Sequence, residues 1–328
     1  MRRLTVAVFG VMAILLLVGG CGNRETSDKN SPAAGMPDKI IVQAPLAPPT
    51  APLFKMVADS LPEGTKLELL VYNTVDEATA RVLKGEADFS VLPVNVAAKL
   101  YNTGIDISLA NVNTWGILYL VSVDDTVKEW QDLKGMELYV GTRGTTPDVL
   151  TQYLLRRNGL KEGEVKLTYL GSPEIAQMVI NGLVKNAVLP EPLVTQVLMK
   201  NQRARVVRDF YADWQRFEGE TSRLPQTGMV VRNGFARSYP DAVAGFHRAY
   251  ASALDWTVAN PDQAAPLVES NLKMPAPVFV RSMERTRLQY AGGSGASKDV
   301  NAYLAKLLDF SPDMVGGKLP DEKFYLPQ

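Results

Sequence analysis

Two short stretches of the chain share the spacing of their glycine and proline residues: GEADFSVLP at residues 85–93 and GLVKNAVLP at residues 182–190. In both of them a glycine is followed six positions later by Val-Leu-Pro. A matching order of elements surrounds the two stretches. The shared spacing and order indicate that the chain contains two similar units.

Each unit alternates strands with helices. The first is predicted to run strand 39–42, helix 50–61, strand 66–72, helix 75–83, strand 87–92; the second runs strand 136–140, a helix ending at 157, strand 165–170, a helix ending at 181, strand 187–189. Such alternation predicts an α/β fold with two lobes, each a mostly parallel sheet flanked by helices.

Two strand-like runs connect the units, at residues 115–121 and 226–231. We interpret them as two hinge crossings. The predicted lobe one is therefore discontinuous (38–118 and 228–328), and lobe two is an insert (119–227). Helices are predicted in the returning part of lobe one at 239–258, 263–271, 276–290 and 298–308.

The amino-acid composition argues against several classes of function. The 328 residues carry 35 Lys and Arg against 35 Asp and Glu, and this zero net charge argues against binding to nucleic acid. A single cysteine, Cys21, and a single histidine, His247, argue against a disulfide framework, a Cys-rich metal site and His-centred catalysis. We expect a monomer with no cofactor, no metal and no catalytic residue.

The N-terminus resembles a bacterial lipoprotein signal. Arg2 and Arg3 precede an apolar run, 4–18, which is shorter than a membrane-spanning helix requires. Cys21 follows two glycines. The resemblance implies a signal peptide at 1–20, lipid attachment at Cys21 and a flexible tether at 21–37, which would place the body on the extracytoplasmic side, in the periplasm or at the outer face. An uncleaved membrane anchor is the alternative.

Candidate ligand-binding residues lie at strand ends and at the crossings, because ligands bind at the carboxyl ends of parallel strands. The predicted set is Thr50, Ala51, Pro93, Asn95, Trp115, Thr142, Arg143, Thr145, Thr146, Glu191, Gln226 and Thr227. Thr50, Asn95 and Thr146 are predicted to cap helices at their N-termini.

Some members of this set have alternative interpretations. Arg143 in GTRGTTP (141–147) either pairs with an anionic ligand or is solvated, and the loop lacks the ending of a nucleotide-binding P-loop. Trp115 either stacks on a planar ligand or belongs to the core. Glu191 either receives an amine or is a surface acid.

Several motifs together resemble a known family. The Cys21 signal, Gly85-Glu-Ala-Asp-Phe, Asp132-Leu-Lys-Gly135, 141–146 and Glu191-Pro192 resemble the ABC-transporter binding proteins for sulfonates, nitrate, taurine and thiamine-precursor pyrimidines. The second unit departs from the Gly-x-Ala-Asp pattern of the first. The resemblance implies a type II periplasmic-binding-protein fold and, as partners, an ABC permease and ATPase.

The resemblance also implies a function. We expect a solute-binding protein that captures a sulfonate, another small anion or an aminopyrimidine-like aromatic and delivers it to the permease. The alternatives are a lipoprotein sensor or adaptor and, less favoured, an enzyme on the same fold; the Cys- and His-rich site of the related pyrimidine synthases is not present in this sequence.

Overall fold

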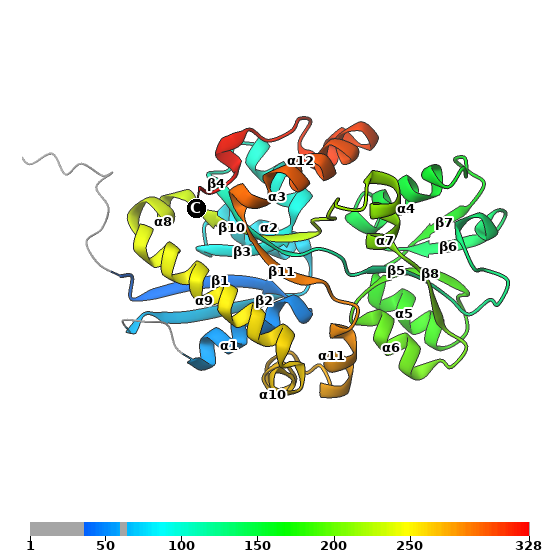
Figure 1. The fold of residues 1–328 in the computed structure, drawn as a ribbon, viewed down its shortest axis with the longest axis horizontal. Helices are drawn as coiled ribbons and strands as arrows, with labels where there is room; N and C mark the ends of the chain where they lie inside the picture. Colours follow the sequence, from blue (N-terminus) through cyan, green and yellow to red (C-terminus); the bar gives the residue numbers. More distant parts are fainter. Residues whose placement is uncertain (1–35, 60–63, 328) are drawn as a thin grey trace, which may run out of the picture. The chain divides into compact units, whose positions relative to one another are not determined.

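The computed structural model describes residues 36–59 and 64–327. The predicted signal peptide, Cys21 and all but the last two residues of the predicted tether lie outside the described residues. Within them the chain forms two β-sheets with helices packed against both (Figure 1).

The first sheet has the strand order β11-β4-β10-β3-β1-β2. Its strands are β1 (Lys39–Pro45), β2 (Lys66–Tyr72), β3 (Phe89–Pro93), β4 (Ile107–Thr114), β10 (Thr227–Arg232) and β11 (Leu288–Gly292). We call this sheet with its helices lobe one. Its helices are α1 (Ala51–Asp59), α2 (Val75–Lys84), α3 (Val94–Asn102), α8 (Asn233–Ser238), α9 (Pro240–Ala259), α10 (Pro261–Leu272), α11 (Ala276–Met283) and α12 (Gly293–Phe310).

The second sheet has the order β7-β6-β8-β5-β9. Its strands are β5 (Leu118–Ser122), β6 (Glu137–Val140), β7 (Lys166–Tyr169), β8 (Asn186–Pro190) and β9 (Arg205–Asp209). We call this sheet with its helices lobe two. Its helices are α4 (Thr146–Arg157), α5 (Ser172–Ile180), α6 (Leu193–Lys200) and α7 (Phe210–Glu218).

The two sheets repeat one arrangement. β2-β1-β3-β10 in lobe one corresponds to β7-β6-β8-β5 in lobe two, with the first three strands parallel and the fourth antiparallel. Gly85 and Gly182 hold equivalent positions with positive φ angles of 68° and 75°, which glycine adopts without strain. The two-lobed α/β fold predicted from the sequence is thus confirmed.

The prediction of mostly parallel sheets needs correction. Antiparallel pairing joins β10 to β3 and β4, β11 to β4, and β5 to β8 and β9. Both sheets are mixed because β10 and β11 in lobe one, and β5 in lobe two, run against the other strands of their sheets.

Two further local predictions were wrong. The helix expected at 276–290 ends at Met283, and residues from Leu288 onward form β11. The expected N-caps also differ: α3 begins after Pro93 and α4 after Thr145, neither with a side-chain cap, and the Thr50 hydroxyl donates to the carbonyl of Pro45 instead.

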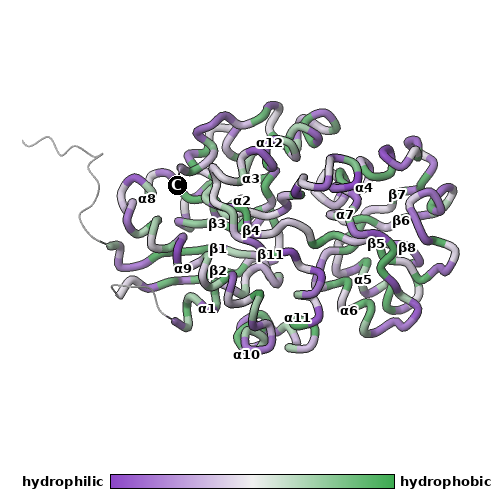
Figure 2. Tube along the Cα trace, viewed as in Figure 1, coloured by the Kyte–Doolittle hydropathy of each residue, from purple (hydrophilic) through white to green (hydrophobic). Residues whose placement is uncertain are grey.

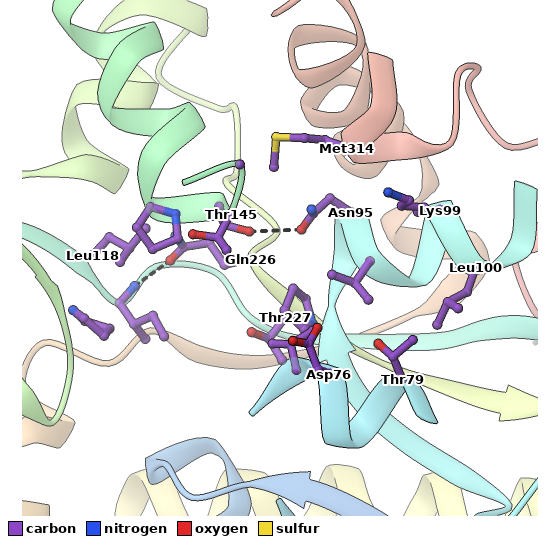
Figure 3. A pocket seen from close by; sticks show the side chains of 18 of the residues that line it. Asp76, Thr79, Asn95, Lys99, Leu100, Leu118, Thr145, Gln226, Thr227 and Met314 are labelled. Carbon is purple, nitrogen blue, oxygen red and sulfur yellow. Dashed lines mark hydrogen bonds between the residues drawn. The ribbon is translucent and has the colours of Figure 1, made fainter. Parts of the chain in front are cut away.

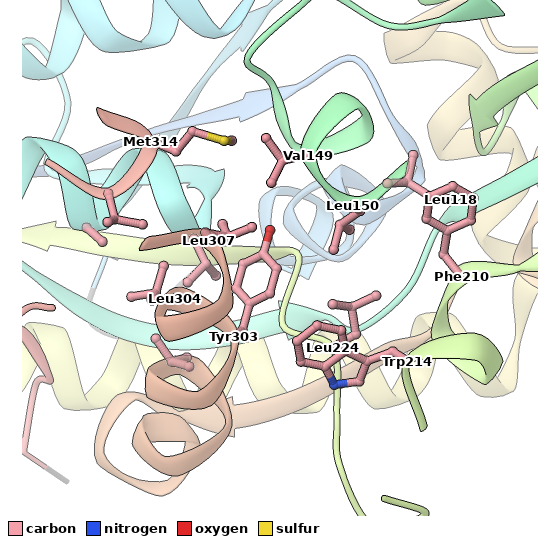
Figure 4. Close-up of a cluster of buried hydrophobic side chains, with 14 of the residues drawn as sticks. Leu118, Val149, Leu150, Phe210, Trp214, Leu224, Tyr303, Leu304, Leu307 and Met314 are labelled. Atoms are coloured by element: carbon pink, nitrogen blue, oxygen red, sulfur yellow. The ribbon is translucent and has the colours of Figure 1, made fainter. Parts of the chain in front are cut away.

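Apolar side chains cover both faces of the sheets, and Figure 2 shows hydrophobic segments along the strands. One cluster continues from lobe one into lobe two, where Tyr303 and Leu304 of α12 meet Trp214 of α7 and Leu150 of α4 (Figure 4). Phe89 of β3 stacks on Phe246 of α9, with ring centroids 4.1 Å apart. The core therefore packs α9 against the start of β3, the end of the strand that lies away from the cavity.

Candidate functional site

A cavity of about 520 Å³ lies where elements of both lobes meet the crossings (Figure 3). Lobe one contributes residues of α2, of α3 and of the end of β3; lobe two contributes the loop and first turn of α4 and the end of β8. The crossings contribute Ile117, Gln226 and the starts of β5 and β10. The cavity is thus located at the carboxyl ends of the parallel strands, where ligands bind in open α/β sheets.

On the side of lobe one, β3 ends at Pro93 and α3 begins at once. This short connection places Asn95 in the first turn of α3 with only 4% of its surface exposed. Leu100, one turn further on, is also buried and adds an apolar wall.

On the side of lobe two, the loop before α4 is held by its own hydrogen bonds. The backbone N–H of Gly144 donates to Asp148 Oδ2 (2.8 Å), and the Tyr169 hydroxyl donates to Asp148 Oδ1 (2.9 Å). Burial and this bond to Asp148 raise the pKa of Tyr169 to about 12, so its hydroxyl stays protonated at neutral pH. The loop therefore presents Thr145 and Thr146 in a fixed position.

A hydrogen bond joins the two lobes across the cavity. The Thr146 hydroxyl donates to Asn95 Oδ1 at 3.0 Å, as Figure 3 shows beside the Asn95 label. Thr146 belongs to lobe two and Asn95 to lobe one. The two lobes are therefore in direct contact at this point.

Gln226 ties the two crossings together. Its side-chain Oε1 accepts from the backbone N–H of Ile117 (2.7 Å) in the first crossing. Its backbone N–H donates to Thr114, and its carbonyl accepts from Val94 at the start of α3 (2.9 and 3.1 Å). One residue thus links β4, the first crossing and α3, and only 4% of its surface is exposed.

The structure places half of the predicted set at this cavity. The lining members are Pro93, Asn95, Thr145, Thr146, Gln226 and Thr227; Thr50, Ala51, Trp115, Thr142, Arg143 and Glu191 do not line it. For the lining residues, contact with a ligand stays a prediction.

Three of the other predicted residues lie inside the fold. Thr50 is fully buried, and Ala51 packs in a cluster with α10 and α11. Trp115 is 2% exposed, its indole N–H donates to the carbonyl of Gln289 (2.8 Å), and the Arg223 guanidinium lies 3.9 Å from its ring centroid. Trp115 therefore occupies the core position given above as its alternative.

Thr142 and Arg143 are exposed, on the loop before α4. The Thr142 carbonyl accepts from the Thr145 hydroxyl (2.5 Å), which closes the turn. The Arg143 guanidinium lies 5.5 Å from the Tyr169 ring centroid. Both residues thus support the loop from outside the cavity.

Glu191 is buried and belongs to a bridge between the lobes. Its Oε1 accepts from Arg285 Nε at 2.5 Å and from the Thr195 hydroxyl at 3.1 Å. Arg285 lies between α11 and β11, and its carbonyl accepts from the Tyr119 hydroxyl. Burial raises the pKa of Glu191, while Arg285 and Thr195 act in the opposite direction.

Few ionisable side chains line the cavity. Its ionisable lining residues are Asp76 and Lys99, of opposite sign and both exposed. Across residues 36–59 and 64–327, no group of three or more His, Cys, Asp or Glu side chains is placed to hold a metal ion. In the same part of the chain, no helix combines the length and apolarity needed to cross a membrane.

Sequence reasoning missed part of the wall. Thr79 on α2, Leu118 at the start of β5 and Met314 after α12 all line the cavity. The helical spacing of α2 gave a signal for Thr79, because it lies one turn after Val75, which lines the cavity too. Nothing in the local sequence distinguishes Met314, which the packing of the C-terminal segment brings to the site.

Comparison with solved structures identifies relatives of this fold. An ABC transporter from Parabacteroides distasonis is 29% identical, with a TM-score of 0.78 over 89% of this chain and 100% of its own. The periplasmic aliphatic sulphonate binding protein SsuA from Escherichia coli is 16% identical, with a TM-score of 0.72 over 87% and 96%. The alkanesulfonate-binding protein SsuA from Xanthomonas axonopodis pv. citri, bound to MOPS, is 15% identical, with a TM-score of 0.67 over 89% and 98%.

These likenesses confirm the predicted resemblance to the type II periplasmic binding proteins of ABC transporters; at identities of 15–16%, the two SsuA proteins show the shared fold alone. A search of curated proteins finds no match to the chain. A family model described as NMT1-like matches residues 58–270, which is more than half of the sequence. The chain therefore belongs to the NMT1-like family.

Proposed function

We propose that this protein is the solute-binding component of an ABC importer. The observation that carries the proposal is the cavity between the lobes, lined by strand ends and helix starts from both of them. Membership of the NMT1-like family and the fold shared with binding proteins of ABC systems agree with it.

Capture of the solute works by hinge closure. Residues 115–117 and 219–226 connect the lobes, and the Asn95–Thr146 hydrogen bond joins the two cavity walls. A ligand that contacts both walls binds the closed form better than the open one, so it shifts the population toward the closed form. The permease then recognises that closed form and receives the solute, with no catalytic step.

The proposal includes the membrane attachment and the domain limits inferred from the sequence. Lipid attachment at Cys21 and the tether at 21–37 keep the body near a permease and its ATPase on the extracytoplasmic side. We place the division of the lobes at the two crossings, one residue before the limits expected from the sequence (118/119 and 227/228), and the protein acts as a monomer. The solute is a sulfonate, another small anion or an aminopyrimidine-like compound.

A thermal-shift screen on the full chain in detergent tests solute binding. The panel holds sulfonates, nitrate, bicarbonate, aminopyrimidines and flavin-like aromatics. A ligand at a hundred times its dissociation constant stabilises the folded form by about 2.7 kcal/mol, which gives a clear shift. No shift with any compound, together with no co-purified small molecule in native mass spectrometry, would contradict the proposal.

A pair of valine variants locates the binding. Val96 lines the cavity and is partly buried, whereas Val57 on α1 is 45% exposed and lies away from it. Val96→Trp is expected to fill the cavity and remove the shift, and Val57→Trp to keep it. Loss of the shift in both variants, with both folded by circular dichroism, would place the binding elsewhere.

A further inference from the structure

Two primary amides form part of the buried wall of the cavity. Asn95 lies in the first turn of α3, and Gln226 immediately precedes β10. Each is 4% exposed, and both line the cavity (Figure 3). Polar side chains this deeply buried normally find partners for all their polar atoms.

The protein engages the oxygen end of each amide. A backbone N–H can only donate, so the 2.7 Å bond from Ile117 fixes Oε1 of Gln226 at that side and the amide nitrogen at the other. The Thr146 hydroxyl, which can donate or accept, donates to Oδ1 of Asn95 at 3.0 Å. The backbone contact therefore fixes the orientation of the Gln226 amide, and the bond to Thr146 holds the Asn95 side chain at the wall.

The nitrogen ends have no protein partner in the part of the chain that the structure describes. Neither Nδ2 of Asn95 nor Nε2 of Gln226 donates to an acceptor there. The starts of α3 and α4 lie at the same cavity without side-chain caps. The Gln226 carbonyl accepts from the Val94 N–H and Pro147 has no N–H, so the other N–H groups of the two first turns add further donors. The buried wall thus offers hydrogen-bond donors, so a ligand that fits it must carry hydrogen-bond acceptors.

The charges and the apolar wall narrow the ligand further. Asp76 and Lys99 are exposed and opposite in sign, so the buried wall holds no cationic side chain to neutralise a full negative charge. Leu100, Leu118 and Met314 are buried and line the same cavity. The arrangement suits an apolar body carrying an uncharged acceptor group.

We propose that Asn95 and Gln226 are the specificity-determining pair of this cavity, and that they select solutes whose buried end is an uncharged hydrogen-bond acceptor, such as a carbonyl or sulfonyl oxygen, on an apolar body. The inference rests on the proposed function and deepens it. It favours a neutral ligand over the sulfonate and other anions that the family resemblance left open.

Two probes of nearly equal shape test whether the cavity prefers a neutral or an anionic ligand. Pentanesulfonamide and pentanesulfonate differ in charge but share the sulfonyl oxygens and the chain. We expect the full chain in detergent to bind the sulfonamide at least about tenfold more tightly by isothermal titration calorimetry, because the wall solvates an acceptor but does not neutralise an anion. Tighter binding of the sulfonate, or binding of neither probe, would overturn the inference.

Two near-isosteric variants test the amides. Asn95→Asp and Gln226→Glu replace each free NH₂ donor by an oxygen, so each is expected to weaken sulfonamide binding about tenfold or more. Gln177→Glu, at an exposed position of α5, is the matched control outside the cavity and is expected to bind as wild type. Circular dichroism checks that each variant is folded.

The outcomes separate the two proposals. Wild-type affinity in both cavity variants would overturn the role of the amides while leaving solute binding intact. A panel hit in the thermal-shift screen combined with no binding of either probe would likewise overturn only this inference. Absence of every panel hit and of any co-purified molecule would instead overturn the proposed function.

Discussion

The ends of β3 and β8 occupy equivalent places in the two repeated units, yet the residues just beyond the two strands differ in role. After Pro93 in lobe one, Asn95 lines the cavity with a free amide nitrogen. After Pro190 in lobe two, Glu191 is buried in an ion pair with Arg285. Two copies of one unit have therefore diverged, so that the residues after one strand end place an amide at the cavity and those after the other hold the lobes together.

Breaking the Arg285–Glu191 pair should have the largest effect on the free energy of unfolding. Arg285→Ala leaves the Glu191 carboxylate buried without its counter-charge, which is expected to destabilise the protein by about 3 kcal/mol. Urea denaturation measures the change. Lys134→Ala, which removes the exposed pair with Glu164, is the control and should change stability by less than about 1 kcal/mol. Equal effects of the two changes would mean that the end of β8 is not a structural joint.

The packing behind β3 predicts an acid sensitivity that the cluster behind β8, which has no histidine among its described members, does not share. His247 lies edge-on to Phe89, its Nδ1 lies 3.4 Å from the Tyr290 hydroxyl, and burial lowers its pKa to about 4. The unfolded chain takes up a proton near pH 6.5 and the folded chain only near pH 4, so stability is lost as the pH falls between these values.

This loss is expected to reach about 2 kcal/mol at pH 5 relative to pH 7. Urea denaturation at the two pH values measures it, with His247→Gln as the variant that no longer titrates. If the wild type and His247→Gln lose the same stability on acidification, the buried neutral histidine is not the cause.

The smallest effect is expected at Arg143, the cation outside the cavity. Arg143→Ala removes a contact with the Tyr169 ring, which is expected to lower stability by about 0.5 kcal/mol and to leave solute affinity within about twofold of wild type. Calorimetry with the strongest compound of the panel checks the affinity. A tenfold loss of solute affinity would mean that Arg143 contributes to binding. It would also weaken the contrast between the two strand ends.

The sequence predicted the strands and helices that are specified by neighbouring residues, and it failed where pairing with distant segments decides the conformation. The spacing of GEADFSVLP and GLVKNAVLP marked β3 and β8, and the predicted strand at 66–72 matches β2. β4 was missed because Asn111 and Asn113 interrupt its apolar pattern, although every residue of the strand is buried. β11 was mistaken for helix because its pairing with β4, nearly two hundred residues earlier, decides its conformation.

The site was half predictable for the same reason. Strand ends identified Pro93, Asn95, Thr145 and Thr146 because the carboxyl ends of parallel strands share one edge. The same rule also selected Glu191, whose partner Arg285 is 94 residues away in the sequence. Which strand end faces a cavity and which faces a counter-charge depends on how the lobes pack, and this is not encoded in any local motif.

The strand order of lobe one sets a sequence of events for the growing polypeptide. β10, which lies between β3 and β4, follows the whole of lobe two in the chain, and β11 follows later still. The five strands of the second sheet, by contrast, come from one continuous segment ending at Asp209. During synthesis or export, lobe two can therefore complete its sheet while lobe one still lacks an inner strand, so the half of the protein that starts first is the half that finishes last.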